Sequence, residues 1–112
     1  MAKILFVDDD EQILKITELL LSPLEYGLFL ANSGKMAIEI LSNKIKREQI
    51  KIIFLDLTMP EMNGLDILEW ISKHGITIPT ILQTGISDQK SLEKAKQLGV
   101  KDFITKPYTK KQ

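Results

Sequence analysis

Acidic residues stand at the ends of two apolar runs in this sequence. Asp8, Asp9 and Asp10 follow the first run, and Asp56 ends another. Carboxylates that are brought together repel one another unless a cation neutralises them, and a hard divalent ion with oxygen ligands, such as Mg2+ or Mn2+, suits such a cluster. A carboxylate beside such an ion can act as a nucleophile toward a phosphoryl group. The four aspartates therefore point to phosphoryl chemistry at a metal site.

These aspartates come together only if the apolar runs are strands of one sheet. Five short apolar runs occupy residues 4–7, 28–31, 52–55, 80–84 and 103–105. Near-continuous apolar runs of this length are typical of strands that are buried on both faces of a parallel sheet. Thr84 ends the fourth run and Lys106 follows the fifth, so a hydroxyl and a lysine are expected at the same edge as the acids.

Helical spacing of apolar residues separates the runs. Ile13, Ile16, Leu20 and Leu24 predict a first helix, which Asp10 can cap. Further helices are predicted after Ser33, around residues 65–71 and between Ser87 and Gly99. Strict alternation of strand and helix predicts a doubly wound, five-stranded parallel α/β sheet. In such folds the site forms beyond the carboxyl ends of the strands, where the acids stand.

Length and composition restrict the function further. The 112 residues make one domain, residues 1–112, and 15 Lys and Arg balance 15 Asp and Glu. Zero net charge argues against a chain that holds nucleic acid by bulk charge. The absence of Cys excludes disulfides and thiolate metal sites, and no apolar stretch is long enough for a membrane span. We therefore expect a cytoplasmic domain without direct nucleic-acid or membrane contact.

Four segments resemble the receiver domains of two-component response regulators. They are residues 6–10 (Phe-Val-Asp-Asp-Asp), 55–64 (Leu-Asp-Leu-Thr-Met-Pro-Glu-Met-Asn-Gly), 83–85 (Gln-Thr-Gly) and 106–108 (Lys-Pro-Tyr). The resemblance covers the chain from about residue 3 to residue 108, with the order and spacing of the family. It implies the flavodoxin-like, chemotaxis-receiver-like fold with strand order 2-1-3-4-5.

The resemblance implies the roles of the metal site. Asp56 would be the phosphoacceptor. Asp9 and Asp56 would bind Mg2+ directly and Asp8 mainly through water, with the backbone carbonyl of Thr58 as a further ligand.

The resemblance also assigns the switch. Thr84 would be the switch hydroxyl, Lys106 the phosphate-binding lysine and Phe103 the aromatic switch residue that turns inward. Thr58 and Ile86 would flank the route of the attacking water and tune the lifetime of the phosphorylated state.

The resemblance implies partners as well. The phosphoryl donor would be a sensor histidine kinase or a phosphotransfer protein, and an output domain or a downstream protein would receive the signal. The domain would be no enzyme, although it assists its own phosphorylation and dephosphorylation. The kinase, the signal and the output stay open.

Receiver domains carry a fifth helix after the Lys-Pro pair, but this sequence stops six residues past Lys106. The start at Met1 favours an amino-terminal receiver of a longer protein. Without the fifth helix we expect one face of the sheet to be incompletely covered. This form should then be marginally stable or self-associate, for example as a homodimer.

Other functions fit the residues less well. A phosphatase of the haloacid dehalogenase type needs a second Asp two residues after its nucleophile, where this chain has Thr58. A flavodoxin-like small-molecule binder needs a Gly- and hydroxyl-rich phosphate loop where this chain has three acids. No nucleotide-binding P-loop segment occurs. A degenerate receiver, used only for binding, would lack acceptor residues that are all present here.

Structural roles are expected for the remaining polar and aromatic residues. His74 should interact with the end of its helix, and residues 44–47 (Lys-Ile-Lys-Arg) should form a solvated loop. Packing roles are expected for Trp70, Met59 and Met62.

Overall fold

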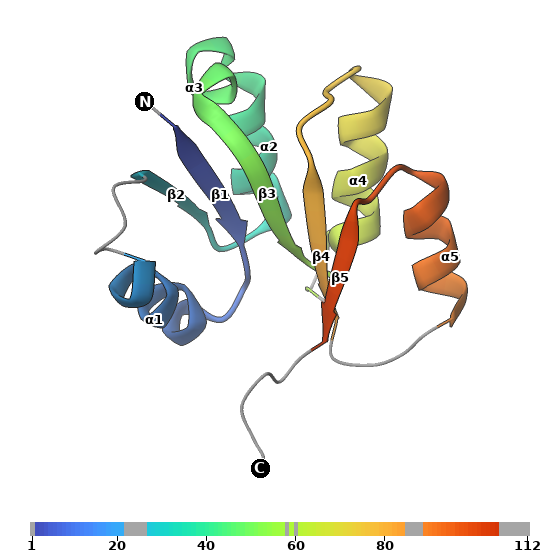
Figure 1. Ribbon diagram of the computed structural model, residues 1–112, viewed down its shortest axis with the longest axis horizontal. Helices are drawn as coiled ribbons and strands as arrows, with labels where there is room; N and C mark the ends of the chain where they lie inside the picture. The colour runs from blue at the N-terminus through green and yellow to red at the C-terminus, as the bar shows by residue number, and fades with distance from the viewer. Residues whose placement is uncertain (1, 22–26, 58, 60, 85–88, 106–112) are drawn as a thin grey trace.

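A five-stranded parallel sheet with the order β2-β1-β3-β4-β5 forms the centre of the molecule (Figure 1). The computed structural model describes residues 2–21, 27–57, 59, 61–84 and 89–105. The strands are β1 (Lys3–Val7), β2 (Gly27–Ala31), β3 (Ile50–Asp56), β4 (Thr80–Thr84) and β5 (Asp102–Thr105). This confirms the predicted doubly wound sheet and its strand order.

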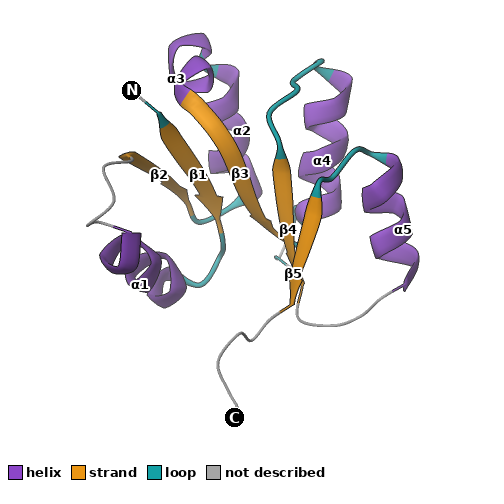
Figure 2. Cartoon of the chain, viewed as in Figure 1, coloured by secondary structure: helices purple, strands orange, loops and turns teal. Residues whose placement is uncertain are grey.

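Helices cover the two faces of the sheet unequally. They are α1 (Glu11–Leu21), α2 (Gly34–Ser42), α3 (Lys44–Gln49), α4 (Gly64–Lys73) and α5 (Gln89–Gln97). Among the described residues, α1 lies alone on one side of the sheet, and the other helices lie on the opposite side (Figures 1 and 2). No helix in this part of the chain is long and apolar enough to cross a membrane.

The core lies between the sheet and α2, α4 and α5. Alternate strand residues point to this side and are fully buried: Leu5, Val7, Ala31, Ile53, Leu55 and Leu82. They pack with apolar residues of the three helices, among them Leu41, Ile67 and Ala95. The intervening apolar residues on the α1 side, such as Phe6 and Phe54, are only half-buried, and these two rings stack with centroids 4.7 Å apart. The two faces therefore differ in how completely they are shielded.

The cap predicted for the first helix is confirmed. Asp10 Oδ1 accepts hydrogen bonds from the backbone N–H groups of Gln12 at 2.9 Å and Ile13 at 3.3 Å. Backbone N–H groups in a first helical turn have no partner within the helix, so this side chain stabilises the start of α1.

The apolar stripe predicted for α1 was wrong at Ile16 and Leu20, whereas Ile13 is half-buried. Ile16 is 55% exposed and Leu20 is 72% exposed, whereas Leu14 is buried. The helix lies on the sheet through Leu14 and the half-buried Ile13 and Thr17, so Ile16 and Leu20 point away from it. Leu24, the last residue of the predicted stripe, lies outside the described residues.

The loop predicted at residues 44–47 is instead the short helix α3. Asn43 starts it by accepting a hydrogen bond from the backbone N–H of Lys46 at 3.0 Å. None of its residues is buried, and Ile45 is exposed. An exposed helix of this length leaves no periodic apolar pattern in the sequence, which is why it was missed.

The ends of α2, α4 and α5 follow the sequence where they can be compared. Ser33 caps α2 by accepting from the backbone N–H of Met36 at 3.1 Å. Gly75 and Gly99, just beyond α4 and α5, adopt the left-handed backbone conformation, with φ of 66° and 93°. The cap predicted at Ser87 lies outside the described residues.

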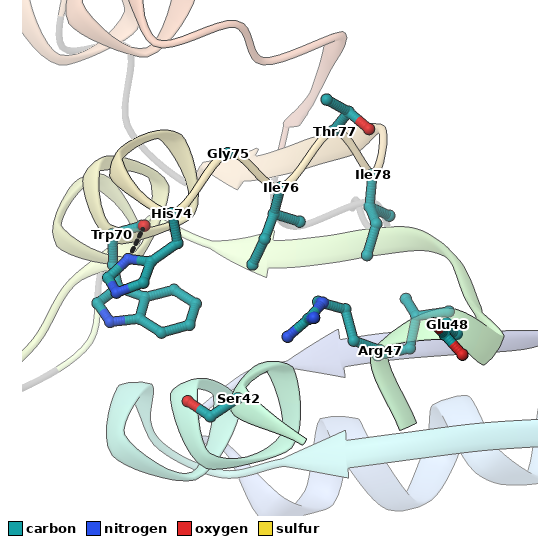
Figure 3. A pocket seen from close by; sticks show the side chains of 10 residues that line it. Ser42, Arg47, Glu48, Trp70, His74, Gly75, Ile76, Thr77 and Ile78 are labelled. Carbon is teal, nitrogen blue, oxygen red and sulfur yellow. Dashed lines mark hydrogen bonds between the residues drawn. The ribbon is translucent and has the colours of Figure 1, made fainter. Parts of the chain in front are cut away.

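His74 and Trp70 have the structural roles expected of them. His74 Nδ1 lies 2.8 Å from the backbone oxygen of Trp70, at the end of α4. The imidazole stacks on the indole with centroids 4.1 Å apart, and Trp70 packs against the core (Figure 3).

Candidate functional site

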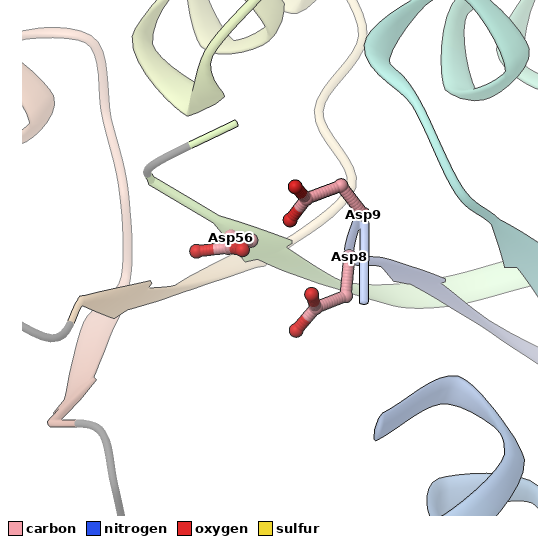
Figure 4. Close-up of side chains that lie close together, drawn as sticks. All are labelled: Asp8, Asp9 and Asp56. Carbon is pink, nitrogen blue, oxygen red and sulfur yellow. The ribbon is translucent and has the colours of Figure 1, made fainter. Parts of the chain in front are cut away.

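Three aspartates meet at the carboxyl ends of β1 and β3. One carboxylate oxygen from each of Asp8, Asp9 and Asp56 lies within 4.8 Å of the others. β1 and β3 are neighbours in the sheet, so the residues that follow β1 reach the residue that ends β3. Figure 4 shows the three carboxylates around a common space. The predicted clustering of these three residues is thus observed.

The three carboxylates differ in their contact with solvent. Asp8 is 0% exposed and Asp56 is 3% exposed, whereas Asp9 is exposed. Burying a carboxylate is costly unless hydrogen bonds or a cation compensate. Asp8 Oδ1 accepts a hydrogen bond from the backbone N–H of Asp10 at 2.9 Å, which fixes its side chain. The site therefore has two buried carboxylates, those of Asp8 and Asp56, and one that is open to solvent, that of Asp9.

The donor set of this cluster suits a hard divalent cation. It consists of carboxylate oxygens only, without nitrogen or sulfur donors from the residues that the structure describes. Such ligands favour Mg2+ or Mn2+, which bind few carboxylates and keep positions for water and phosphate oxygens. A cation here would also offset the mutual repulsion of the acids.

Hydrogen bonds fix the segment after Asp56 to β4 and to the start of α4. The backbone N–H of Leu57 donates to the oxygen of Gln83 at 2.8 Å, and that of Gly64 donates to the oxygen of Leu57 at 2.9 Å. Met59 is buried in the core and Met62 packs against it, as predicted. Asp56 is therefore positioned by the fixed segment that follows it.

Gln83 is a residue of this region that sequence analysis did not single out. Its side chain is 2% exposed, and it pairs with Asp56 in the register of β3 and β4. Paired residues of neighbouring parallel strands point to the same face of the sheet, so the Gln83 side chain lies beside Asp56. The available signal was a long polar residue inside the otherwise short, largely apolar run of residues 80–84.

The structure does not describe the side chains of the remaining predicted site residues. Thr84 ends β4 and Phe103 lies in β5, but the structure describes only their backbone. Thr58, Ile86 and Lys106 lie outside the described residues. Thr84 pairs with Thr105, so the backbone positions of the two strand ends agree with the predicted convergence. The roles of these five residues stay predictions.

The sequence matches the family described as the response regulator receiver domain over residues 4–112. The chain belongs to this family. Response regulator SaeR of Staphylococcus aureus (strain USA300) is 33% identical over 112 residues, which cover 100% of this chain and 47% of the relative. This receiver domain thus spans about half the length of the curated relatives that it matches.

Solved receiver domains have the same fold. The signal receiver domain of an HD domain-containing protein from Pseudomonas fluorescens Pf-5 is 30% identical, with a TM-score of 0.85 over 96% of this chain and 84% of that one. A CheY-like receiver domain protein from Methanospirillum hungatei JF-1 is 25% identical, with a TM-score of 0.87 over 97% and 84% of the two chains.

Membership of the receiver family indicates the function of the acidic cluster. Receiver domains of response regulators are signalling domains whose function is to accept a phosphoryl group. The chain is such a domain, and its three clustered aspartates lie at the edge of the sheet where doubly wound folds form their sites.

Proposed function

We propose that Asp56 accepts a phosphoryl group from the phosphohistidine of a sensor histidine kinase or phosphotransfer protein. A carboxylate oxygen of Asp56 attacks phosphorus in line, the new P–O bond forms, and the bond from phosphorus to the histidine nitrogen breaks. The observation that supports this is the meeting of Asp8, Asp9 and Asp56 within 4.8 Å. The histidine leaves as the neutral ring once it takes up a proton.

Asp8, Asp9 and Asp56 would hold Mg2+ or Mn2+, with the backbone carbonyl of Thr58 as a further ligand. The ion supplies positive charge for the transferring phosphoryl oxygens. Asp9 is the exposed member and remains open to the incoming group, whereas Asp8 is fixed by its hydrogen bond to the backbone of Asp10.

Phosphorylation then shifts the domain toward a signalling conformation. The phosphoryl group adds roughly 1.5 to 2 negative charges. The ammonium group of Lys106 and the hydroxyl of Thr84 would interact with its oxygens. Movement of Thr84 leaves space for Phe103, and the change shifts a pre-existing equilibrium. The receiver signals in the cytoplasm to an output domain or a downstream protein, and it assists its own dephosphorylation.

The outer face of α1 is the docking surface for the phosphoryl donor. Ile16, Leu19 and Leu20 are all large, apolar and more than half exposed there. The helix begins directly after Asp8, Asp9 and Asp10, so a donor that brings its histidine to Asp56 also covers α1. An apolar helical surface of the donor fits this face.

Incubation with Mg2+ and acetyl phosphate tests the assignment of the acceptor. Intact-mass spectrometry should show one added phosphoryl group on the wild-type chain and on Asp10→Asn, which keeps a capping side chain outside the cluster. Asp56→Asn should show none, and chelation of the metal should suppress the reaction. The same adduct on Asp56→Asn would show that another residue is the acceptor.

A further inference from the structure

A pocket lies at the edge of the sheet opposite the aspartates. We call it the α3–α4 pocket, and the argument concerns five of its lining residues: Arg47, Trp70, His74, Ile76 and Ile78. Its volume is about 660 Å3, within the range of small-molecule sites. None of these residues belongs to the acidic cluster or to the phosphoryl chemistry proposed above.

One wall of the α3–α4 pocket carries a fixed positive charge. Arg47 Nη1 donates to the backbone oxygen of Leu41 at 2.8 Å, which holds the guanidinium in place. A guanidinium has five N–H donors, so this bond leaves donors for a ligand. Among the described residues no carboxylate forms an ion pair with Arg47. Figure 3 shows the guanidinium pointing toward Trp70, with Glu48 on the other side.

The opposite wall is aromatic and aliphatic. Ile76 and Ile78 project into the pocket from the segment after α4, and the Trp70 indole faces Arg47 across it (Figure 3). Because His74 Nδ1 bonds to a carbonyl oxygen, which only accepts, the ring hydrogen lies on Nδ1. Arg47, on the facing wall, carries the permanent positive charge that an anion in this pocket would pair with.

The surrounding charge favours an anion. Residues 42–51 contain Lys44, Lys46, Arg47 and Lys51 against Glu48, which gives +4 − 1 = +3, and residues 70–80 add Lys73. The nearest acid on α4, Glu69, faces α5, where it pairs with Lys94 at 3.8 Å. The positive charge of this edge of the molecule therefore attracts anions, in addition to the hydrogen-bond donors of Arg47.

We propose that the α3–α4 pocket binds an apolar acid, a carboxylate joined to an aromatic or branched aliphatic group. The carboxylate would pair with Arg47, in the planar geometry that guanidinium groups favour, and the apolar group would lie against Trp70, Ile76 and Ile78. The ligand is either a small free acid or the carboxyl-terminal residue of a peptide, since both present the same groups.

Trp70 is the single tryptophan of the chain and reports binding by its fluorescence. Phenylacetate should give a saturable change. Phenylacetamide, which has the same shape without the charge, should bind at least about tenfold more weakly, because the charge-assisted hydrogen bonds are lost. Acetate, which lacks the apolar group, should give no saturation in the same range.

Two matched variants separate the pocket from general charge. Arg47→Gln should weaken phenylacetate at least about tenfold and leave phenylacetamide unchanged. Lys44→Gln removes the same charge from the first residue of α3 outside the pocket and should change neither affinity more than about twofold. Equal losses in the two variants, or none in Arg47→Gln, would overturn the proposal.

A measurement on the unaltered chain keeps the test independent of the stability of Arg47→Gln. In 1H–15N spectra, phenylacetate should shift the Trp70 indole N–H and the amides of Ile76 and Ile78 and leave Asp8 and Asp9 unmoved. Shifts centred elsewhere would refute the site. A peptide with a carboxyl-terminal phenylalanine distinguishes the sources: tighter binding than phenylacetate identifies a chain end, and equal or weaker binding identifies a small acid.

Discussion

Gly64 lies against the backbone of the proposed phosphoacceptor. A Cβ atom at this position would be 2.6 Å from the backbone oxygen of Asp56 and 2.9 Å from the Cα atom of Leu57. Backbone atoms at the end of β3 cannot move without displacing Asp56 itself. The requirement for glycine here is therefore steric, and it couples the start of α4 to the acidic cluster.

Gly64→Ala should lower the free energy of unfolding by about 2 kcal/mol, because the added methyl group forces backbone atoms apart. Gly34→Ala is the matched control, since Gly34 is also the first residue of a capped helix. The three atoms nearest to a Cβ there all belong to the Met62 side chain and none to the backbone. Urea denaturation measures both, and equal losses would show that the Asp56 contact is not the cause.

The lifetime of the phosphorylated state is a second question at the scale of single residues. Ile86 offers no polar group to orient an attacking water, so hydrolysis of phospho-Asp56 should be slow for this family. Ile86→Glu should hasten the decay several-fold, because a carboxylate can position and activate that water. Decay is followed by intact-mass spectrometry after removal of the phosphodonor, and an unchanged or slower rate would contradict the assigned role.

Residue types at strand ends were enough to predict the acidic cluster. Asp8, Asp9 and Asp56 follow from the order of apolar runs, because the carboxyl ends of parallel strands share one edge of the sheet. The position of Gln83 beside Asp56 did not follow in the same way. Its meaning depends on the register of β3 against β4, which hydrophobic pattern does not specify for strands buried on both faces.

At the scale of elements, the strands were predicted well and two helical details were not. The face of α1 that meets the sheet is set by how the helix docks, and Leu14 rather than Ile16 lies in the contact. Apolar residues all round a helix allow more than one stripe, so spacing alone does not select between them. The helix α3 depends on the cap at Asn43 and carries no buried residue.

The exposed apolar row on α1 gives a prediction about recognition of the donor. Replacing both Ile16 and Leu20 with Ser should slow phosphotransfer from the cognate kinase about tenfold or more, because exposed apolar anchors are lost from the contact. Phosphorylation by acetyl phosphate should be unchanged, since that donor needs no docking surface. Rates are compared by following transfer of labelled phosphate.

Ile45→Ser is the control for that experiment, because Ile45 is also apolar and exposed but belongs to α3 and not to α1. It should leave both rates unchanged. If Ile16→Ser/Leu20→Ser slows acetyl phosphate and the kinase to the same degree, the helix acts on the acidic cluster itself and not on docking.

At the scale of the whole molecule, a formal net charge of zero conceals a separation of charge. Acidic side chains gather at the carboxyl edge of the sheet, at Asp8, Asp9 and Asp56, whereas the opposite edge carries Arg47 and its neighbouring lysines. Composition alone predicted no bulk attraction to nucleic acid. It could not predict this polarity, because the polarity depends on which strand ends and helix ends the fold brings together.

The sheet itself is shielded unequally by the helices that the structure describes, because α1 alone lies on one of its sides. On the α1 side, apolar residues of four strands are only half-buried by the described residues, among them Phe6, Leu30, Phe54 and Ile81. One helix is about 10 Å wide, whereas five strands at about 4.8 Å spacing span roughly twice that distance. Apolar side chains that stay partly exposed on one face favour association.

We therefore expect the 112-residue chain to self-associate through the α1 side of the sheet or to be marginally stable. Sedimentation should show a mass that rises with concentration, and Ile81→Lys should shift the chain toward the monomer because it places a charge on that face. Ile45→Lys, on the exposed surface of α3, should leave association unchanged. A chain that stays monomeric at high concentration would show that the face is already shielded.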